Sequence, residues 1–296
     1  MKRTKGEKAY SVFNYIFLAV VGLVTVFPFY ITLINSISPA IDFALKPINL
    51  WPSRVDISSY RTIIGKNTGI LNAYGITIFV TVVGTALNMA FTVLAAVALS
   101  IKKLPYRNAI TLFFVFTMYF SGGMIPSYLL NRYMGLLNNI WVMIIPSMVS
   151  VMNMLYLRNF ISQIPHEIME SASIDGCSDI KMVPYIILPL STAAIATFSL
   201  FYAVGHWNDF YNCAVYITDS TKYNLQVYLM NVLRDARAMK LNAAEMVKIH
   251  EAGSRQPPTE SLKAANIMAA TIPIVCLYPF LQKYFIKGLV VGSLKG

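Results

Sequence analysis

Charged residues are scarce in this sequence. Asp, Glu, Lys and Arg make up 12% of its 296 residues, whereas hydrophobic residues make up 56%. Soluble globular domains carry about 25% charged residues, so the composition predicts a protein embedded in a membrane. The net charge is +11, yet no block of Lys and Arg alternates with aromatic residues as on a nucleic-acid-binding surface. The basic residues lie near the ends of apolar runs, where they would suit anionic membrane lipid.

The sequence contains neither an ATP-binding loop nor a motif for ion-coupled transport. No G-x-x-x-x-G-K-[ST] loop is present to hold ATP phosphates, and the Gly65-Lys66 pair has Tyr60 where the first glycine belongs. Nor do the apolar runs contain a chain of carboxylates for proton or sodium coupling. The nearest exception is Asp209, just after one run. If the chain forms a transport pathway, an external motor must drive it.

Features of metalloproteins and hydrolases are also missing. The cysteines Cys177, Cys213 and Cys276 are isolated, which excludes a disulfide framework or a metal-ligand spacing. The segment His166–Glu170 has glutamate where the H-E-x-x-H zinc motif needs its second histidine. We expect no catalytic residues and no metal site.

Long apolar runs dominate what is present. The first, of about 23 residues, is too long for a signal-peptide core and right for a membrane span. The sequence predicts an all-α, polytopic protein with one transmembrane domain over 1–296 and six spans, at about 12–34, 73–101, 109–125, 139–157, 185–207 and 264–284. The short 102–107 turn carries three basic residues and the 126–138 turn carries one. The positive-inside rule then places both termini and the loop 158–184 in the cytoplasm and the long loop 208–262 outside.

Two asparagines interrupt the apolar runs. Asn88 and Asn153 lie within the second and fourth predicted spans, where an unpaired amide is costly. Each side chain could form a helix–helix hydrogen bond or line a translocation pathway. Near Asn88, threonines recur every four residues at Thr77, Thr81 and Thr85, with Gly84 alongside. Small residues at this spacing let helices approach closely.

The polar segment from Pro165 to Pro189 organises the rest of the chain. A helix is predicted with Ser162 as a possible cap and Pro165 in its first turn. Its predicted apolar face consists of Ile164, Ile168 and Ala172, with Met169 beside them. Gly176 is predicted to end this helix. A second short helix is predicted from Ser178-Asp179.

The same segment resembles a loop of ABC-importer permeases. That loop reads E-A-A, three residues, G, nine residues, I-x-L-P. Here Glu170-Ser171-Ala172 is followed at this spacing by Gly176 and by Ile186 to Pro189, with Ser171 as a small-for-small departure. The resemblance implies a coupling helix that docks into a cleft of the ATP-hydrolysing subunit; spacing alone would allow an ordinary amphipathic surface helix. The residues implied in docking are Glu167, Glu170, Ser171, Ala172, Asp175, Gly176, Ile186, Leu188 and Pro189.

Two further segments resemble one branch of this permease family in particular. Trp207-Asn208-Asp209 is similar to the W-N-[DE] of carbohydrate-uptake permeases, and Tyr278 to Gly296 is similar to the end of the smaller six-span permease of maltose-type and alginate-oligosaccharide importers. The resemblance implies a second homologous permease subunit, an ATPase dimer that binds ATP and Mg, and an extracellular solute-binding protein. It also implies that the tail, with Ser293, Lys295 and Gly296, contacts the ATPase.

The predicted function is that of a permease subunit of an ATP-driven oligosaccharide importer in the plasma (inner) membrane of a bacterium. This chain needs no cofactor of its own. The candidate substrate-pathway residues are Asn88, Tyr119, Asn153, Trp207 and Asn208, and Tyr202 is another aromatic that could stack on a sugar. The 208–262 loop could contact the binding protein or lie on the outer membrane surface as a helical hairpin. The alternatives are an ABC permease for a non-sugar solute, a secondary transporter and a membrane-embedded enzyme.

Overall fold

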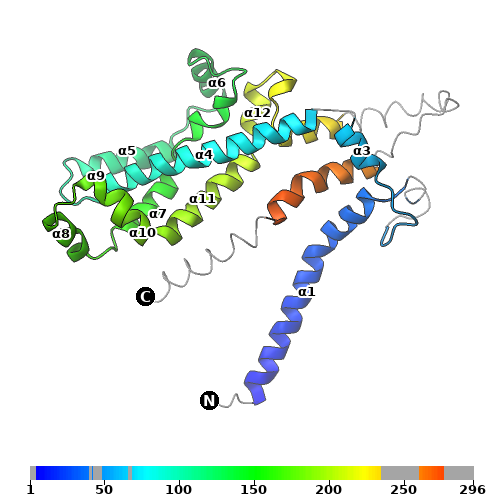
Figure 1. Ribbon diagram of the computed structural model, residues 1–296, viewed down its shortest axis with the longest axis horizontal. Coiled ribbons are helices and arrows are strands. Elements are labelled where there is room, and N and C mark those ends of the chain that lie inside the picture. Colours follow the sequence, from blue (N-terminus) through cyan, green and yellow to red (C-terminus); the bar gives the residue numbers. More distant parts are fainter. Residues whose placement is uncertain (1–4, 40–41, 43–48, 66–68, 235–259, 277–296) are drawn as a thin grey trace. The chain divides into compact units, whose positions relative to one another are not determined.

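The structure is a computed structural model that describes residues 5–39, 42, 49–65, 69–234 and 260–276 (Figure 1). These residues form helices and connecting turns, with no strand among them. The all-α prediction is therefore confirmed. The chain divides into two compact units, residues 1–70 with 229–273 and residues 71–228 with 274–296, and each is described by itself.

The first unit contains α1 (Lys5–Ser36), α3 (Ser58–Gly65) and a helix over 260–276. Hydroxyl groups join these three helices. The Tyr60 hydroxyl donates to Ser36 Oγ at 2.9 Å, and Ser59 Oγ donates to Ser261 Oγ at 2.9 Å. Ser261 Oγ in turn donates to the Ser36 carbonyl oxygen at 3.4 Å. The side chains of α1 from Val12 to Phe29 are largely exposed in this chain, as expected of a helix that faces lipid or another subunit.

The second unit is a bundle built on α4 (Gly69–Ser100), α5 (Arg107–Tyr119), α7 (Val151–Ile161) and α11 (Thr192–Trp207). Figure 1 shows these helices lying alongside one another, with α8 (His166–Ile174) and α9 (Asp179–Met182) beyond one end. Their core contains Val93 and Ala96 of α4, Leu157 of α7, and Phe198 and Tyr202 of α11. This apolar core fixes α11 against α4 and α7.

A second core lies toward the other end of α4. It includes Val80, the 3₁₀ segment η1 (Ile140–Met143), and Cys213 and Tyr216 of α12 (Tyr211–Tyr216). The η2 (Ile145–Ser147) turn follows η1, and α6 (Met124–Tyr133) precedes it. Beyond α12, the chain continues through η4 (Ser220–Lys222) into a helix that starts at 225. Thr77 Oγ1 accepts from the Leu225 backbone N–H at 2.8 Å and ties this helix to α4.

Three predicted spans are broken rather than straight. The helices α5 and α6 meet at 114°, the segments 140–147 and 151–161 at 49°, and the segments 180–190 and 192–207 at 87°. Among the described residues, α1 and α4 are long and apolar enough to cross a membrane singly, and the bent pairs raise the number of spans to as many as five. The sixth predicted span, 264–284, continues past residue 276 and lies partly outside the described residues.

Three details of the local predictions are wrong. The 126–138 stretch is not a turn, because α6 occupies most of it; Gly123, at φ +84°, separates α6 from α5. Ser162 does not cap α8 but ends α7, where its N–H donates to the Arg158 carbonyl oxygen. Pro165, predicted in the first turn of the next helix, is instead its N-cap.

Candidate functional site

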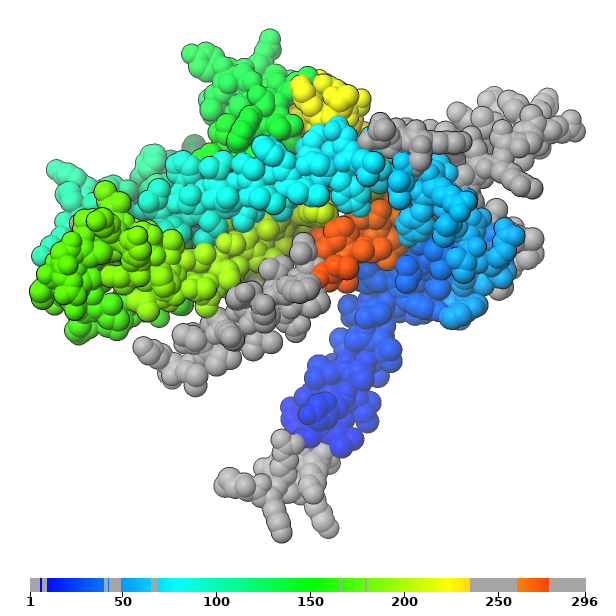
Figure 2. Space-filling model, in the orientation of Figure 1, coloured from blue at the N-terminus to red at the C-terminus, as the bar shows by residue number. Residues whose placement is uncertain are grey.

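The first candidate site is the surface segment from α8 to α10 (Leu188–Leu190). Figure 2 shows it in green at the left end of the second unit. The end of α8 has a well-defined geometry. Gly176 has φ +81°, its N–H donates to the Ser173 carbonyl oxygen, and the Cys177 N–H donates to the Ala172 carbonyl oxygen. This pair of bonds is a Schellman motif, in which a left-handed residue satisfies the last carbonyls of a helix. The predicted role of Gly176 in ending the helix is confirmed.

A continuous path of packing joins this segment to the bundle. The α9 helix contacts α8 on one side and the π-helical turn η3 (Val183–Ile187) on the other, and α10 contacts both η3 and α11. Ile187 is buried in the bundle core, and Ile164, Met169 and Leu188 pack against that core. The segment is therefore packed on the same core as Phe198 and Tyr202 of α11.

The apolar face of α8 follows the prediction at Ile164 and Met169 but not at Ile168. Ile164 and Met169 pack on the core, whereas Ile168 is 40% exposed. Two isoleucines project into solvent: Ile174, the last residue of α8, is 86% exposed, and Ile180 of α9 is 84% exposed. Contiguous exposed apolar surface is typical of sites that bind a partner, which makes these two side chains candidates for such a contact. The family motif did not include these two residues.

The residues assigned to ATPase docking fall into two groups. Four residues with polar side chains, Glu167, Glu170, Ser171 and Asp175, are exposed on or just after α8, as is Gly176, whereas Ala172 on the same helix is half-buried. In the I-x-L-P part, Ile186 and Leu188 are half-buried and Pro189 is exposed. The structure therefore places the first group on the surface and the second group where the segment joins the bundle. The tail residues Ser293, Lys295 and Gly296 lie outside the described residues.

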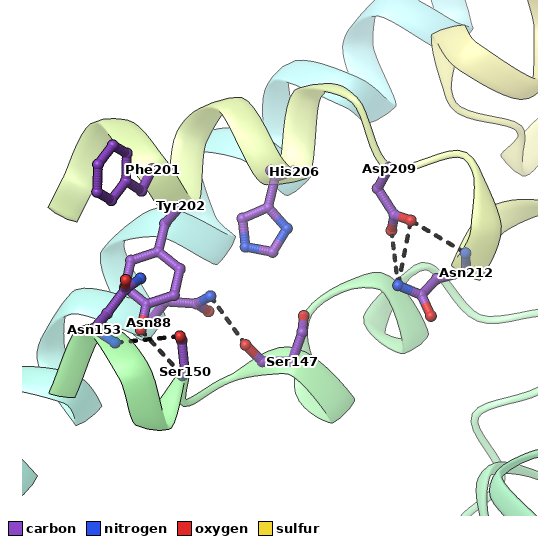
Figure 3. Close-up of a pocket in the computed structure, with 10 residues that line it drawn as sticks. Asn88, Ser147, Ser150, Asn153, Phe201, Tyr202, His206, Asp209 and Asn212 are labelled. Atoms are coloured by element: carbon purple, nitrogen blue, oxygen red, sulfur yellow. Dashed lines mark hydrogen bonds between the residues drawn. The ribbon is translucent and has the colours of Figure 1, made fainter. Parts of the chain in front are cut away.

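The second candidate site is a polar pocket of about 310 Å³ within the second unit (Figure 3). Asn88 of α4, Ser147 of η2, and Ser150 and Asn153 at the start of α7 form one side. The other side is formed by Phe201, Tyr202, Gly205 and His206 of α11, followed by Asp209 and Asn212. The pocket thus lies where the broken span 140–161 exposes polar groups to α4 and α11.

Hydrogen bonds fix the pocket wall. Asn88 Nδ2 donates to the Ser147 carbonyl oxygen at 3.1 Å. The Tyr202 hydroxyl lies 2.7 Å from Thr92 Oγ1 and accepts from the Ser150 N–H at 3.1 Å. Ser150 Oγ accepts from the Asn153 N–H at 3.4 Å as the N-cap of α7. These bonds hold the start of α7 against α4 and α11.

A glycine allows α11 to approach α4 closely. A Cβ atom added to Gly84 would lie 2.5 Å from His206 Nε2 and 2.8 Å from His206 Cε1. Only a residue without a side chain fits against the imidazole here. The expectation that small residues on α4 permit close helix packing is met at Gly84.

Asp209 lies just past α11, at the edge of the pocket. Its Oδ1 accepts from the Asn212 N–H at 3.1 Å, and both carboxylate oxygens accept from Asn212 Nδ2 at 3.2 Å. Burial raises the pKa of Asp209, and the two hydrogen bonds from Asn212 lower it. The carboxylate is therefore oriented by its neighbour and only partly shielded from the pocket.

The five candidate pathway residues do not gather at one place. Asn88 and Asn153 both line the pocket. Tyr119 is 85% exposed at the end of α5, and Asn208 is exposed with its amide donating to the Val204 carbonyl oxygen. Trp207 is buried beside His206 in sequence but does not line the pocket.

Sequence reasoning missed several pocket residues. Ser147 and Ser150 follow Pro146, which breaks the fourth predicted span, and this break was the available signal for exposed polar groups. His206, one of three histidines in the chain, is an ionisable residue in an apolar run, which by default suggests a functional position. Tyr202, one of the aromatics considered for sugar stacking, does line the pocket.

These features define a class: a helical transmembrane transport subunit, with a polar pocket among its spanning helices and a surface segment packed onto them. Comparisons with known proteins identify the family, although no family model matches the chain. It is 39% identical to protein LplC of Bacillus subtilis, over 100% of this chain and 98% of the relative. It is also 39% identical to the polygalacturonan/rhamnogalacturonan transport system permease YtcP of the same species, over 98% and 99% of the two chains.

A solved structure agrees with these relatives. A chain of a bacterial ABC transporter involved in the import of the acidic polysaccharide alginate matches with a TM-score of 0.85 and 28% identity, over 96% of this chain and 99% of that one. The present chain belongs to the family of carbohydrate ABC-transporter permeases. It is thus a transport subunit of the inner membrane and not an enzyme, and permeases of this kind work with an ATPase and a solute-binding protein.

Proposed function

We propose that this chain is the permease subunit of an oligosaccharide importer and transmits the motion of a partner ATPase through the segment 165–190. The observation that carries the proposal is that Met169 of α8 and Ile187 of η3 pack in the same core as Phe198 of α11. Ile174 and Ile180 project from the outer face of the segment and would anchor it in an apolar cleft of the ATPase. Glu167, Glu170 and Asp175 would add polar contacts around these anchors.

The remaining partners follow from the same proposal. A second homologous permease subunit completes the pathway, and the ATPase dimer holds ATP and Mg. Both termini and the coupling segment face the cytoplasm, and the tail with Ser293, Lys295 and Gly296 reaches the ATPase. The loop 208–262 faces the extracellular solute-binding protein.

The substrate class is an oligosaccharide. The relatives' names support this: one is a polygalacturonan/rhamnogalacturonan permease, and others from Halalkalibacterium halodurans and Bacillus subtilis are arabinooligosaccharide permeases. The solved alginate importer adds a further polysaccharide. In the present chain, Asn88 and Asn153 are the pathway residues that the pocket favours over Tyr119, Trp207 and Asn208.

Substitution of Gly176 tests the coupling. Valine is strongly disfavoured at φ +81°, because a left-handed conformation costs an ordinary residue about 1–2 kcal/mol and a β-branched one more. Gly176→Val should leave assembly and ATP hydrolysis in place and reduce ATP-driven sugar uptake by roughly 5–30-fold or more. The assay is uptake and phosphate release by the whole transporter in proteoliposomes.

Gly176→Asn is the matched control, since asparagine tolerates the left-handed region and a Cβ atom at this position meets nothing within 4 Å. Its uptake should stay close to that of the wild type. Equal uptake by the valine and wild-type proteins would refute the coupling role. Uptake that persists without the ATPase would instead favour a secondary transporter.

A further inference from the structure

The pocket has polar groups available on its open side. Ser147, Ser150 and Asn153 contribute two hydroxyls and an amide, and the Asn153 side chain is only partly buried. Hydroxyls and amides can each donate and accept hydrogen bonds. Such a set matches a ligand whose own groups both donate and accept, as sugar hydroxyls do.

Two buried polar atoms lie in the side chains behind this wall. Asn88 is 1% exposed and His206 is 6% exposed, and neither Asn88 Oδ1 nor His206 Nε2 has a hydrogen-bond partner. A buried polar atom left without a partner costs about 1–3 kcal/mol. Polar residues that served only to join helices would have their hydrogen bonds satisfied by those helices. Asn88 Oδ1 thus retains capacity for a further hydrogen bond, whereas His206 Nε2 faces Gly84 of α4.

The pocket also has an apolar surface and open space. Phe201 lines it and is 50% exposed. Gly205, one turn further along α11, lines it as well, and a Cβ atom there meets nothing within 4 Å. An apolar ring beside a few convergent polar groups is typical of small-ligand sites, whose volumes begin near 300 Å³.

The charges of the residues that line the pocket restrict the charge of a ligand that can bind there. Its ten residues include the carboxylate of Asp209 and neither lysine nor arginine. A ligand carboxylate would lose its hydration without gaining a cationic partner, and it would also be repelled by Asp209. An uncharged ligand incurs neither cost.

We propose that this pocket is a sugar subsite belonging to this subunit, and that it takes an uncharged, hydroxyl-bearing unit and rejects a uronate unit. The proposal rests on the proposed function in sugar transport and adds the chemistry that one subunit selects. Acidic units of a substrate would be accommodated by groups outside this pocket.

Site-directed labelling tests the proposal in the assembled transporter. Asn153→Cys is introduced with Cys177→Ser and Cys276→Ser, and the rate of maleimide labelling is measured in proteoliposomes. Cys213 stays in place: it is fully buried, and burial raises the pKa of its thiol to about 11, so it stays protonated at neutral pH. The probes are α-1,4-linked galactobiose and α-1,4-linked digalacturonate, which differ only in the oxidation of C6.

Galactobiose should slow labelling severalfold, and digalacturonate at the same concentration should not.

A second variant fills the site. Gly205→Leu in the same background should abolish the protection while labelling without sugar persists, which reports an intact fold. Gly75→Leu on α4 is the matched control, because Gly75 also has open space around a Cβ atom and is not a lining residue; protection should survive there.

Equal protection by both sugars, or by neither, would overturn the proposal. So would protection that survives Gly205→Leu. Failure of the proposed function has a different signature: ATP hydrolysis and sugar uptake by the wild-type transporter would be absent or unlinked. Coupled uptake without protection from labelling would refute the subsite and leave the proposed function intact.

Discussion

The coupling segment and the pocket are built in opposite ways. The segment 165–190 is continuous in sequence, and it exposes apolar side chains, most of all Ile174 and Ile180. The pocket is assembled from α4, η2, α7 and α11, and its most buried side chains, Asn88 and His206, are polar. In each site, some side chains lie where their polarity is normally unfavourable: apolar side chains at the surface and polar side chains in the interior. In a transport subunit, such residues indicate where a partner or a ligand supplies the missing contact.

The largest expected effect comes from removing the apolar anchors of the coupling segment. Ile174→Asp with Ile180→Asp places charges where the ATPase is proposed to bury apolar surface. Loss of interface anchors costs about 2 kcal/mol or more, or roughly 30-fold in affinity. Co-purification of the ATPase and ATP-driven uptake should both fall by at least about that factor.

Leu50→Asp is the control for that prediction. Leu50 is 56% exposed and lies between the first two predicted spans, on the side that the predicted orientation places outside, away from the ATPase. ATPase binding should be retained in this variant. If the paired isoleucine variant also retained ATPase binding, the coupling segment would not be the docking surface.

Close packing between α4 and α11 gives the next effect. In Gly84→Ala, the new methyl group would displace the His206 imidazole, and overpacking of this kind costs about 1–3 kcal/mol. The thermal midpoint of the purified transporter should fall by several degrees. Gly75→Ala, on the same helix with open space around it, should leave the midpoint unchanged or raise it slightly, because alanine favours helix.

A double variant sharpens this result. If the Gly84→Ala methyl group acts through the imidazole, adding His206→Ala should recover part of the lost stability, a coupling that a double-mutant cycle measures. Strictly additive losses would mean that Gly84 matters for another reason.

The smallest predicted effect concerns the pocket wall. Tyr202→Phe removes the hydroxyl that pairs with Thr92 and accepts from the Ser150 N–H. Thr92 is fully buried, so the loss should cost about 1–2 kcal/mol of stability. Tyr156→Phe is the control, since Tyr156 is 53% exposed on α7. Equal thermal midpoints for the Tyr202→Phe and Tyr156→Phe proteins would contradict a stabilising role for the hydrogen bonds of the pocket wall.

The two sites also differ in how far the sequence predicted them. Gly176 was predictable because a helix end with a left-handed residue is a local feature. Ser162 was misplaced because a serine between two helices can end the first as well as cap the second. Asn88 and Asn153 were identified by their cost within apolar runs.

The remaining pocket residues depend on tertiary structure. The bend of 49° between 147 and 151 turns Ser147 and Ser150 toward α11, and no local pattern specifies that direction. The aromatic candidates Tyr119 and Trp207 lie at helix ends, where aromatic residues are common in membrane proteins for other reasons. Their side chains do not line the pocket.

The most direct measurement is sugar uptake by proteoliposomes that contain this chain with its partner permease, ATPase and loaded binding protein. Uptake should require ATP hydrolysis, stop when a non-hydrolysable ATP analogue replaces ATP, and fall in the Ile174→Asp, Ile180→Asp variant. Uptake driven by a proton or sodium gradient in the absence of the ATPase would contradict the account.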